Sequence, residues 1–208
     1  MIKGGKLLLL FFALFVFTGH KHSFAQNLDI KILKSINPRY PTSHYWRGTS
    51  NSAYYMAGAA TVGTLIYGLA SNNTEIKRNA VESFVTIGAS VLVTHLGKIT
   101  VNRTRPADKY PDEIFVNTPT HNMSFPSGHS SLAFATATTL SMQYNKWYVT
   151  VPAYVWASSV GYSRMYLGKH YPTDVLAGAA VGIGSAYAAR WFNKQLFGQR
   201  QQLTKKYQ

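Results

Sequence analysis

The chain has 208 residues, about the length of one domain, and it contains no cysteine, which excludes disulfides, thiolate catalysis and Cys-ligated zinc. Apolar residues make up 46% of it and charged residues only 13%, against about 25% in ordinary soluble domains, although a mean hydropathy of -0.08 leaves membrane association open. The net charge of +14 favours an anionic lipid or an anionic substrate over nucleic acid, because the basic residues are scattered and form no basic stripe on one element.

The N-terminus has the tripartite pattern of a signal peptide. Lys3 and Lys6 precede an apolar run from Leu7 to Phe17, and small residues stand at the expected cleavage positions, Ser23 to Ala25. The apolar run is too short to cross a bilayer comfortably, so we expect residues 1–25 to be a signal peptide that is cleaved after Ala25. An uncleaved membrane anchor is the alternative, and either one would target the chain for export. Residues 26–208 would then form the functional domain.

The remaining residues predict an all-α fold, a single helical bundle of about five to six helices. Residues 26–51 are polar and mixed and are expected to be irregular, and three prolines within residues 104–125 predict a long loop. Pro172 suits the first position of a helix. No segment has the strict alternation of a half-buried strand. The expected helices cover approximately residues 54–70, 75–100, 127–144, 147–165 and 172–196.

Three segments concentrate cations, histidines and a helix start at the junctions between loops and helices. Lys98 is followed after six residues by Arg105-Pro106, where a predicted helix gives way to the long loop. Pro126-Ser127-Gly128-His129 opens the next predicted helix. The third segment joins the last two helices. It consists of Ser163-Arg164, five further residues, His170, three further residues and Asp174.

These residue types predict a phosphate-binding site that needs no metal ion. Lys98, Arg105 and Arg164 are cations whose hydrogen-bond donors match phosphate oxygens. Ser127 and Gly128 lie at a helix start, where unpaired amides and the helix dipole favour an anion. Gly128 has no Cβ, so a phosphate could approach the backbone closely.

His170, His129 and Asp174 are the expected catalytic residues. Because His170 and Asp174 lie four residues apart, the carboxylate could hold one imidazole nitrogen and leave the other free to attack phosphorus. His129 could then protonate the departing oxygen, since a reference pKa of about 6.5 suits proton transfer near neutral pH. A two-step reaction of this kind requires no cofactor.

The three segments, in this order and at these spacings, resemble the signature of the type 2 phosphatidic acid phosphatase and vanadium haloperoxidase superfamily. The resemblance spans residues 98–174 without a departure at any motif position. It implies a helical bundle, a phosphohistidine at His170, no metal, and hydrolysis of phosphomonoesters or pyrophosphates, with lipid phosphates as the expected substrates. Three alternatives stay open, namely a soluble periplasmic acid phosphatase, a vanadate-dependent haloperoxidase and a non-enzymatic protein that binds anionic lipid.

The distribution of basic residues predicts an orientation in a membrane. In an up-and-down bundle the three segments lie at one end, and the opposite end has the basic bias of a cytoplasmic face. We therefore expect an exported, inner-membrane-associated protein whose active site faces the periplasm. Several predicted helices fall short of the roughly 20 uncharged residues that a span prefers, which keeps the soluble alternative open. The basic residues at the opposite end are Lys77, Arg78, Lys146, Arg190, Lys194, Arg200, Lys205 and Lys206.

Overall fold

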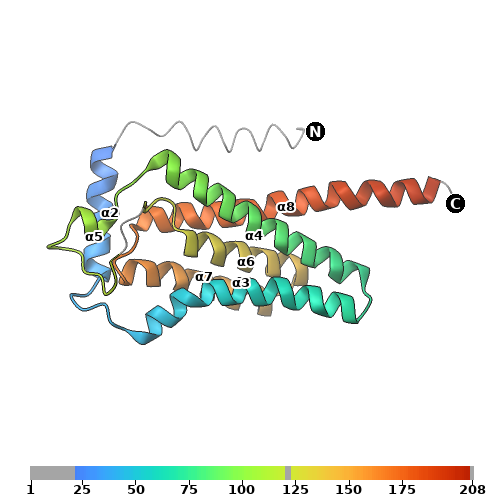
Figure 1. Cartoon of the computed structure of the whole chain (residues 1–208), viewed down its shortest axis with the longest axis horizontal. Coiled ribbons are helices and arrows are strands. Elements are labelled where there is room, and N and C mark those ends of the chain that lie inside the picture. Colours follow the sequence, from blue (N-terminus) through green and yellow to red (C-terminus); the bar gives the residue numbers. More distant parts are fainter. Residues whose placement is uncertain (1–21, 120–122, 207–208) are drawn as a thin grey trace.

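The computed structural model describes residues 22–119 and 123–206, and the described chain is all-α. Five long helices, α3, α4, α6, α7 and α8, run side by side along the long axis of the molecule (Figure 1). Helix α2 lies across one end of this bundle, beside the short helix α5 (Figure 1). The helices are α2 (His22–Ile36), α3 (His44–Ala70), α4 (Thr74–Val101), α5 (Pro106–Lys109), α6 (Gly128–Tyr144), α7 (Trp147–Tyr166) and α8 (Pro172–Lys206).

The five helices expected from the sequence are all present, and the prediction of an all-α bundle is confirmed. The prediction that residues 26–51 are irregular is wrong, because this stretch contains most of α2 and the first turns of α3. Helix α2 is stabilised by tertiary packing, since Leu33 is fully buried against Ile114 and Tyr171. Helix α3 begins ten residues before the predicted start and is capped by Ser43, whose side chain accepts a hydrogen bond from the Trp46 amide.

The predicted signal peptide lies almost wholly outside the described residues. Residues 1–21 are not described, and the predicted cleavage point after Ala25 falls within α2. Cleavage therefore stays a prediction.

Helices α6 and α8 approach one another closely enough for their backbones to touch. A Cβ atom added at Gly178 would lie 2.4 Å from the carbonyl oxygen of Ser127, and one added at Gly182 would lie 2.2 Å from that of Ser131. Only glycine fits at these two positions. The close approach brings the start of α6 against the start of α8, where the Ser127 amide donates to the Asp174 carbonyl at 3.0 Å.

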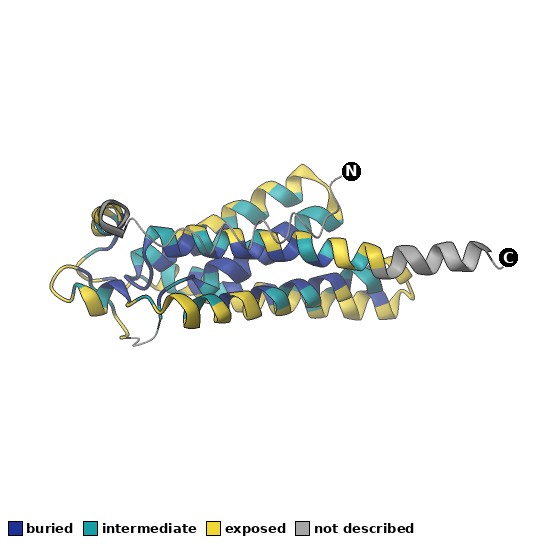
Figure 2. Cartoon of the chain, turned by 90° about the horizontal axis from the view of Figure 1, so that it is seen from above, coloured by how far each residue is buried: buried dark blue, intermediate teal, exposed yellow. Residues whose placement is uncertain are grey.

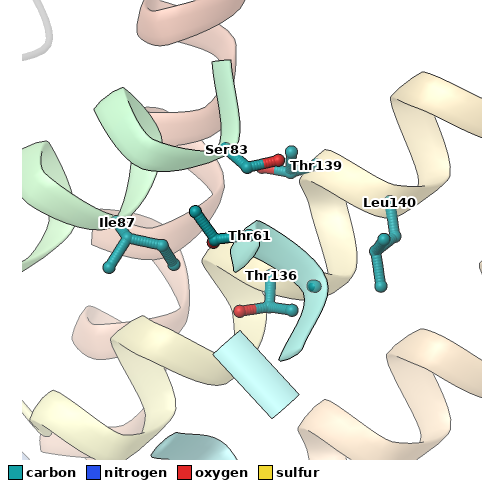
Figure 3. Close-up of a pocket in the computed structure, with 7 residues that line it drawn as sticks. Thr61, Ser83, Ile87, Thr136, Thr139 and Leu140 are labelled. Carbon is teal, nitrogen blue, oxygen red and sulfur yellow. The ribbon is translucent and has the colours of Figure 1, made fainter. Parts of the chain in front are cut away.

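The interior of the bundle contains many hydroxyl groups. The Ser90 and Ser131 hydroxyls lie 2.5 Å apart, and Thr94 donates to Ser131 at 3.0 Å, which ties α4 to α6. A small cavity of about 10 Å³ lies between α3, α4 and α6, and Figure 3 shows Ser83 beside Thr139 on its wall. This volume is about that of one water molecule, so the cavity is too small for a substrate.

Exposed residues follow the outward sides of the helices over much of their length (Figure 2), and many of them are large and apolar. Exposed apolar surface on this scale is typical of a face that contacts lipid or another protein. Two segments, Thr74–Lys109 and Pro172–Gln195, are long and apolar enough to cross a bilayer. We call the exposed side chains the apolar belt. Its members include Val62, Leu65, Ile66, Leu69, Val81, Phe84, Val91, Leu92, Leu96, Ile99, Val151, Val155, Trp191 and Phe192.

Candidate active site

The three sequence segments meet at the end of the bundle that α2 and α5 cover (Figure 1). Lys98 lies in the last turn of α4, and Arg105 directly precedes α5. Arg164 lies in the last turn of α7. The remaining predicted residues lie at the starts of two helices. Ser127 caps α6, and Gly128 and His129 are its first two residues. His170 precedes α8, and Asp174 lies in the first turn of that helix.

His170 is 2% exposed, and its ring is held by a backbone carbonyl. Nδ1 lies 2.7 Å from the Ser124 oxygen, which can only accept, so Nδ1 carries the proton and Nε2 keeps a lone pair. The nearer Asp174 oxygen is 3.6 Å from Nδ1, beyond hydrogen-bond distance. We expected Asp174 to hold one imidazole nitrogen, but the Ser124 carbonyl takes the Nδ1 hydrogen bond and fixes the tautomer.

The pKa of His170 is lowered from its ordinary value to about 3. Burial is the main cause, the neighbouring Asp174 opposes the shift, and the Arg164 charge adds to it. The imidazole is therefore neutral at physiological pH. A neutral ring with a fixed tautomer has the form that a nitrogen nucleophile needs.

The three predicted cations are anchored by neighbouring oxygens. Lys98 donates to the Met123 carbonyl at 2.7 Å, and Arg105 donates to the Lys169 carbonyl at 2.7 Å. Arg164 is 8% exposed and donates to the Ser50 hydroxyl at 2.6 Å. Its Nε is buried and has no hydrogen-bond partner within residues 22–119 and 123–206. Cations fixed in this way are preorganised for an oxyanion.

The start of α6 leaves room for an anion beside Gly128. A Cβ at Gly128 would meet only the Thr94 methyl group, at an ordinary contact distance of 3.7 Å, so packing does not require glycine there. Ser127 is fully buried, and its hydroxyl accepts from Ser130 while its amide donates to Asp174. This differs from the expectation that the Ser127 amide faces a ligand. The amides of Gly128 and His129 are the next two at this helix start.

Helix α3 contributes residues that the sequence did not indicate. The Tyr54 ring packs edge-on against His129, with centroids 4.7 Å apart, and Ser50 of the same helix accepts the hydrogen bond from Arg164. Neither residue lies in a motif. Their spacing of four residues places both on one helix face, but an Ala- and Tyr-rich helix offers many such pairs.

Arg103 and Asp29 form a second missed group next to Asp174. Arg103 donates to one Asp174 oxygen at 2.7 Å and to Asp29 at 2.8 Å, and its guanidinium lies 3.8 Å from the centre of the Tyr171 ring. The other Asp174 oxygen accepts from the Tyr171 amide at 2.9 Å. Asp29, on α2, also accepts from the Thr173 amide at 3.0 Å. The buried Asp174 carboxylate is thus balanced by Arg103, and the basic run around Lys98 was its only sequence signal.

A helical bundle that gathers two histidines, a buried carboxylate and several fixed cations at one end has the residues of a site for a tetrahedral oxyanion. Residues 79–197 match the model of the PAP2 superfamily, and the chain belongs to that superfamily. It is 41% identical to the Lipid A 1-phosphatase of Porphyromonas gingivalis over 90 residues, which cover 40% of this chain and 20% of that protein. The bacitracin transport permease protein BcrC of Bacillus licheniformis is 31% identical over 144 residues, 67% of each chain.

Two crystal structures have the same fold. LpxE of Aquifex aeolicus superposes with a TM-score of 0.62 at 27% identity, over 78% of this chain and 94% of that one. The PAP2-type phosphatidylglycerolphosphate phosphatase of Bacillus subtilis superposes with a TM-score of 0.69, over 90% and 94% of the two chains. At 24% identity the second structure supports the fold alone. The chain spans less than half the length of several curated relatives that it matches.

Proposed function

We propose that the protein is a phosphatase that hydrolyses lipid phosphates, either monoesters or pyrophosphates, through a phosphohistidine at His170. The observation that carries this proposal is the buried, neutral imidazole of His170, whose Nδ1 proton is held by the Ser124 carbonyl among fixed cations. Membership of the PAP2 superfamily supports the reaction class, and the name of the Porphyromonas gingivalis relative supports a lipid phosphate as substrate.

The mechanism follows from the positions of these groups. Nε2 of His170 attacks phosphorus, the bond to the leaving oxygen breaks, and His129 gives that oxygen a proton. Burial and the Arg164 charge lower the pKa of His129 to about 2 in the empty site, so His129 takes up this proton only when the negative charge of the bound phosphate offsets the cations. The negative charge that spreads over the equatorial oxygens is stabilised by three cations, Lys98, Arg105 and Arg164. The amides of Gly128 and His129 add hydrogen bonds to the same oxygens. Asp174 balances the imidazolium character that His170 gains. Water then attacks the phosphohistidine, with His129 taking its proton, and His170 is regenerated.

The apolar belt supports a location in the membrane over a soluble periplasmic phosphatase, because so many exposed apolar side chains would contact water otherwise. The α3–α4 and α6–α7 turns lie at the opposite end from the site (Figure 1). Lys146 lies in the second of these turns, and Lys77 and Arg78 lie just after the first, at the start of α4. Positive residues favour the cytoplasmic side. We therefore place the active site on the periplasmic side of the inner membrane.

A phosphate-release assay in detergent tests this function. We expect the purified chain to release phosphate from at least one of phosphatidic acid, phosphatidylglycerol phosphate and an isoprenyl diphosphate in excess EDTA, and we expect vanadate to inhibit it, since vanadate can occupy a phosphate site. Activation by vanadate with peroxide-dependent oxidation of halide would indicate the haloperoxidase instead. Absence of phosphate release from all three lipids would contradict the proposal and leave the lipid-binding alternative.

Arg103→Gln is expected to lower kcat by about 10- to 100-fold and to change KM less, because Asp174 loses its charge partner and His170 shifts from its productive position. Arg103→Lys should recover part of the loss, since it restores the positive charge but cannot bridge Asp29 and Asp174 as the guanidinium does. The exposed Arg39 provides a matched control, and Arg39→Gln should leave both constants unchanged. A 10- to 100-fold rise in KM with an unchanged kcat would instead show that Arg103 binds substrate and does not position Asp174.

A further inference from the structure

A polar cavity of about 210 Å³ adjoins the candidate active site. Its walls come from the first turns of α3, from residues 117–118 and from the end of α7 with the loop that follows. Three of its lining residues are cations, Arg47, Arg164 and Lys169, and none of the lining residues is acidic. Only Arg164 belongs to a sequence motif, so the cavity holds two cations that the proposed mechanism does not use.

The charged side chains of Arg47, Arg164 and Lys169 donate to neutral oxygens of the protein, and Arg47 is only partly buried. The Nε atoms of both Arg47 and Arg164 are buried and make no hydrogen bond to the described part of the chain. Lys169 is 9% exposed, and its ammonium donates to the Thr118 carbonyl, a neutral partner. Burial and the charges of Arg164 and Arg105 lower the pKa of Lys169 to about 8, and the charge of Asp108, which does not line the cavity, opposes this shift. Arg164 and Lys169 are the buried members of this group, and cations buried beside neutral partners are costly unless an anion joins them.

The cavity shares helix α3 with the ring that packs against His129. In an in-line displacement the leaving oxygen is opposite the attacking His170 nitrogen, next to the proton donor His129. His129 packs against Tyr54 of α3, and the two preceding turns of that helix supply Arg47 and Ser50 to the cavity wall. Arg164 lines the cavity, donates to Ser50 and is also one of the three cations of the predicted phosphate-binding site. The cavity and that site therefore share this residue.

We propose, on the basis of the proposed phosphatase function, that this cavity binds a second phosphate, so that the preferred substrates are diphosphates whose leaving group is itself a phosphate monoester. The bond between His170 Nε2 and the terminal phosphorus forms as the bridging P–O bond breaks. The electron pair stays on the bridging oxygen, which leaves as part of the lipid monophosphate, and Arg47 and Lys169 balance its charge. Water releases inorganic phosphate from His170 in the second step.

The test compares two lipids that differ only in the second phosphate, geranylgeranyl diphosphate and geranylgeranyl monophosphate, with the full chain in one detergent. The measured quantity is the ratio of kcat/KM for the diphosphate to that for the monophosphate. We expect Lys169→Met and Arg47→Gln each to lower this ratio by at least about tenfold, the size expected for a lost hydrogen bond to a charged group. Lys169→Arg should keep the ratio near that of the unmodified chain.

Two exposed cations outside the cavity provide matched controls. Lys31→Met and Arg39→Gln remove the same charges from the same end of the molecule and should leave the ratio unchanged. Ratios within about twofold of the unmodified chain for both cavity variants would overturn the proposal, since charge-assisted contacts contribute more than that. If Lys169→Met does not fold, Arg47→Gln decides the outcome. Failure of the unmodified chain to hydrolyse either lipid would instead overturn the phosphatase function itself.

Discussion

The His170→Gln variant is expected to lose at least about 10⁴-fold in kcat, because it lacks the imidazole nitrogen that forms the covalent intermediate. Glutamine keeps a similar volume and can still donate to the Ser124 carbonyl, so the bundle should stay folded. The measurement is phosphate release in detergent, together with alkaline SDS quenching of the chain after mixing with ³²P-labelled substrate. The unmodified chain should retain label that is stable to alkali and labile to acid, and the variant should retain none.

His95 provides the control for this experiment. It lies on α4 one turn before Lys98, and its side chain is exposed. His95→Gln should keep full activity and full labelling. Labelled phosphate on the His170→Gln variant would place the nucleophile elsewhere and contradict the mechanism.

The second large effect is expected for His129→Ala, and its size should depend on the leaving group. With an alkyl phosphate we expect a loss of about 10³-fold in kcat, within the range for a general acid. With p-nitrophenyl phosphate the loss should be about tenfold or less, because nitrophenolate leaves without a proton. The measurement is kcat for both substrates at one pH.

Tyr54→Leu is a useful companion to this variant. It removes the ring that packs against His129 while keeping an apolar side chain on α3, so a small loss with the same leaving-group dependence is expected. Equal losses of the His129→Ala variant on both substrates would contradict a role as general acid. They would indicate that His129 mainly shapes the start of α6.

The sequence predicted the parts of the site that are local. Ser127 before an apolar run marks the start of α6, and Pro172 marks the start of α8, so the motif residues could be assigned to one end of an up-and-down bundle. The existence of the five long helices could be predicted as well, although the start of α3 lies ten residues before the predicted position. Helix α2 could not, since its stability comes from Leu33 packing against residues more than 75 positions away.

The missed residues share a different property, which is that their partners are distant in sequence. Asp29, Arg103 and Thr173 converge from three separate segments, and no spacing pattern connects them. The Ser124 oxygen that orients His170 is a backbone atom, which any residue type could supply. Residue identity therefore carries no signal for the contact that fixes the tautomer. Lys169 was missed because a single lysine beside a motif histidine is also the usual appearance of a solvated surface charge.

The contact between α6 and α8 has a mechanical consequence. Gly178 and Gly182 leave no space for even one methyl group between the two main chains, so rigid backbone sets the spacing between the start of α6, which carries His129, and the start of α8, which follows His170. We expect a thicker or thinner bilayer to tilt the outer helices, and with them the side chains of the apolar belt, before it separates α6 from α8. Catalytic geometry should accordingly tolerate lipids of different chain length, even where the packing of α3 or α4 against the bilayer changes.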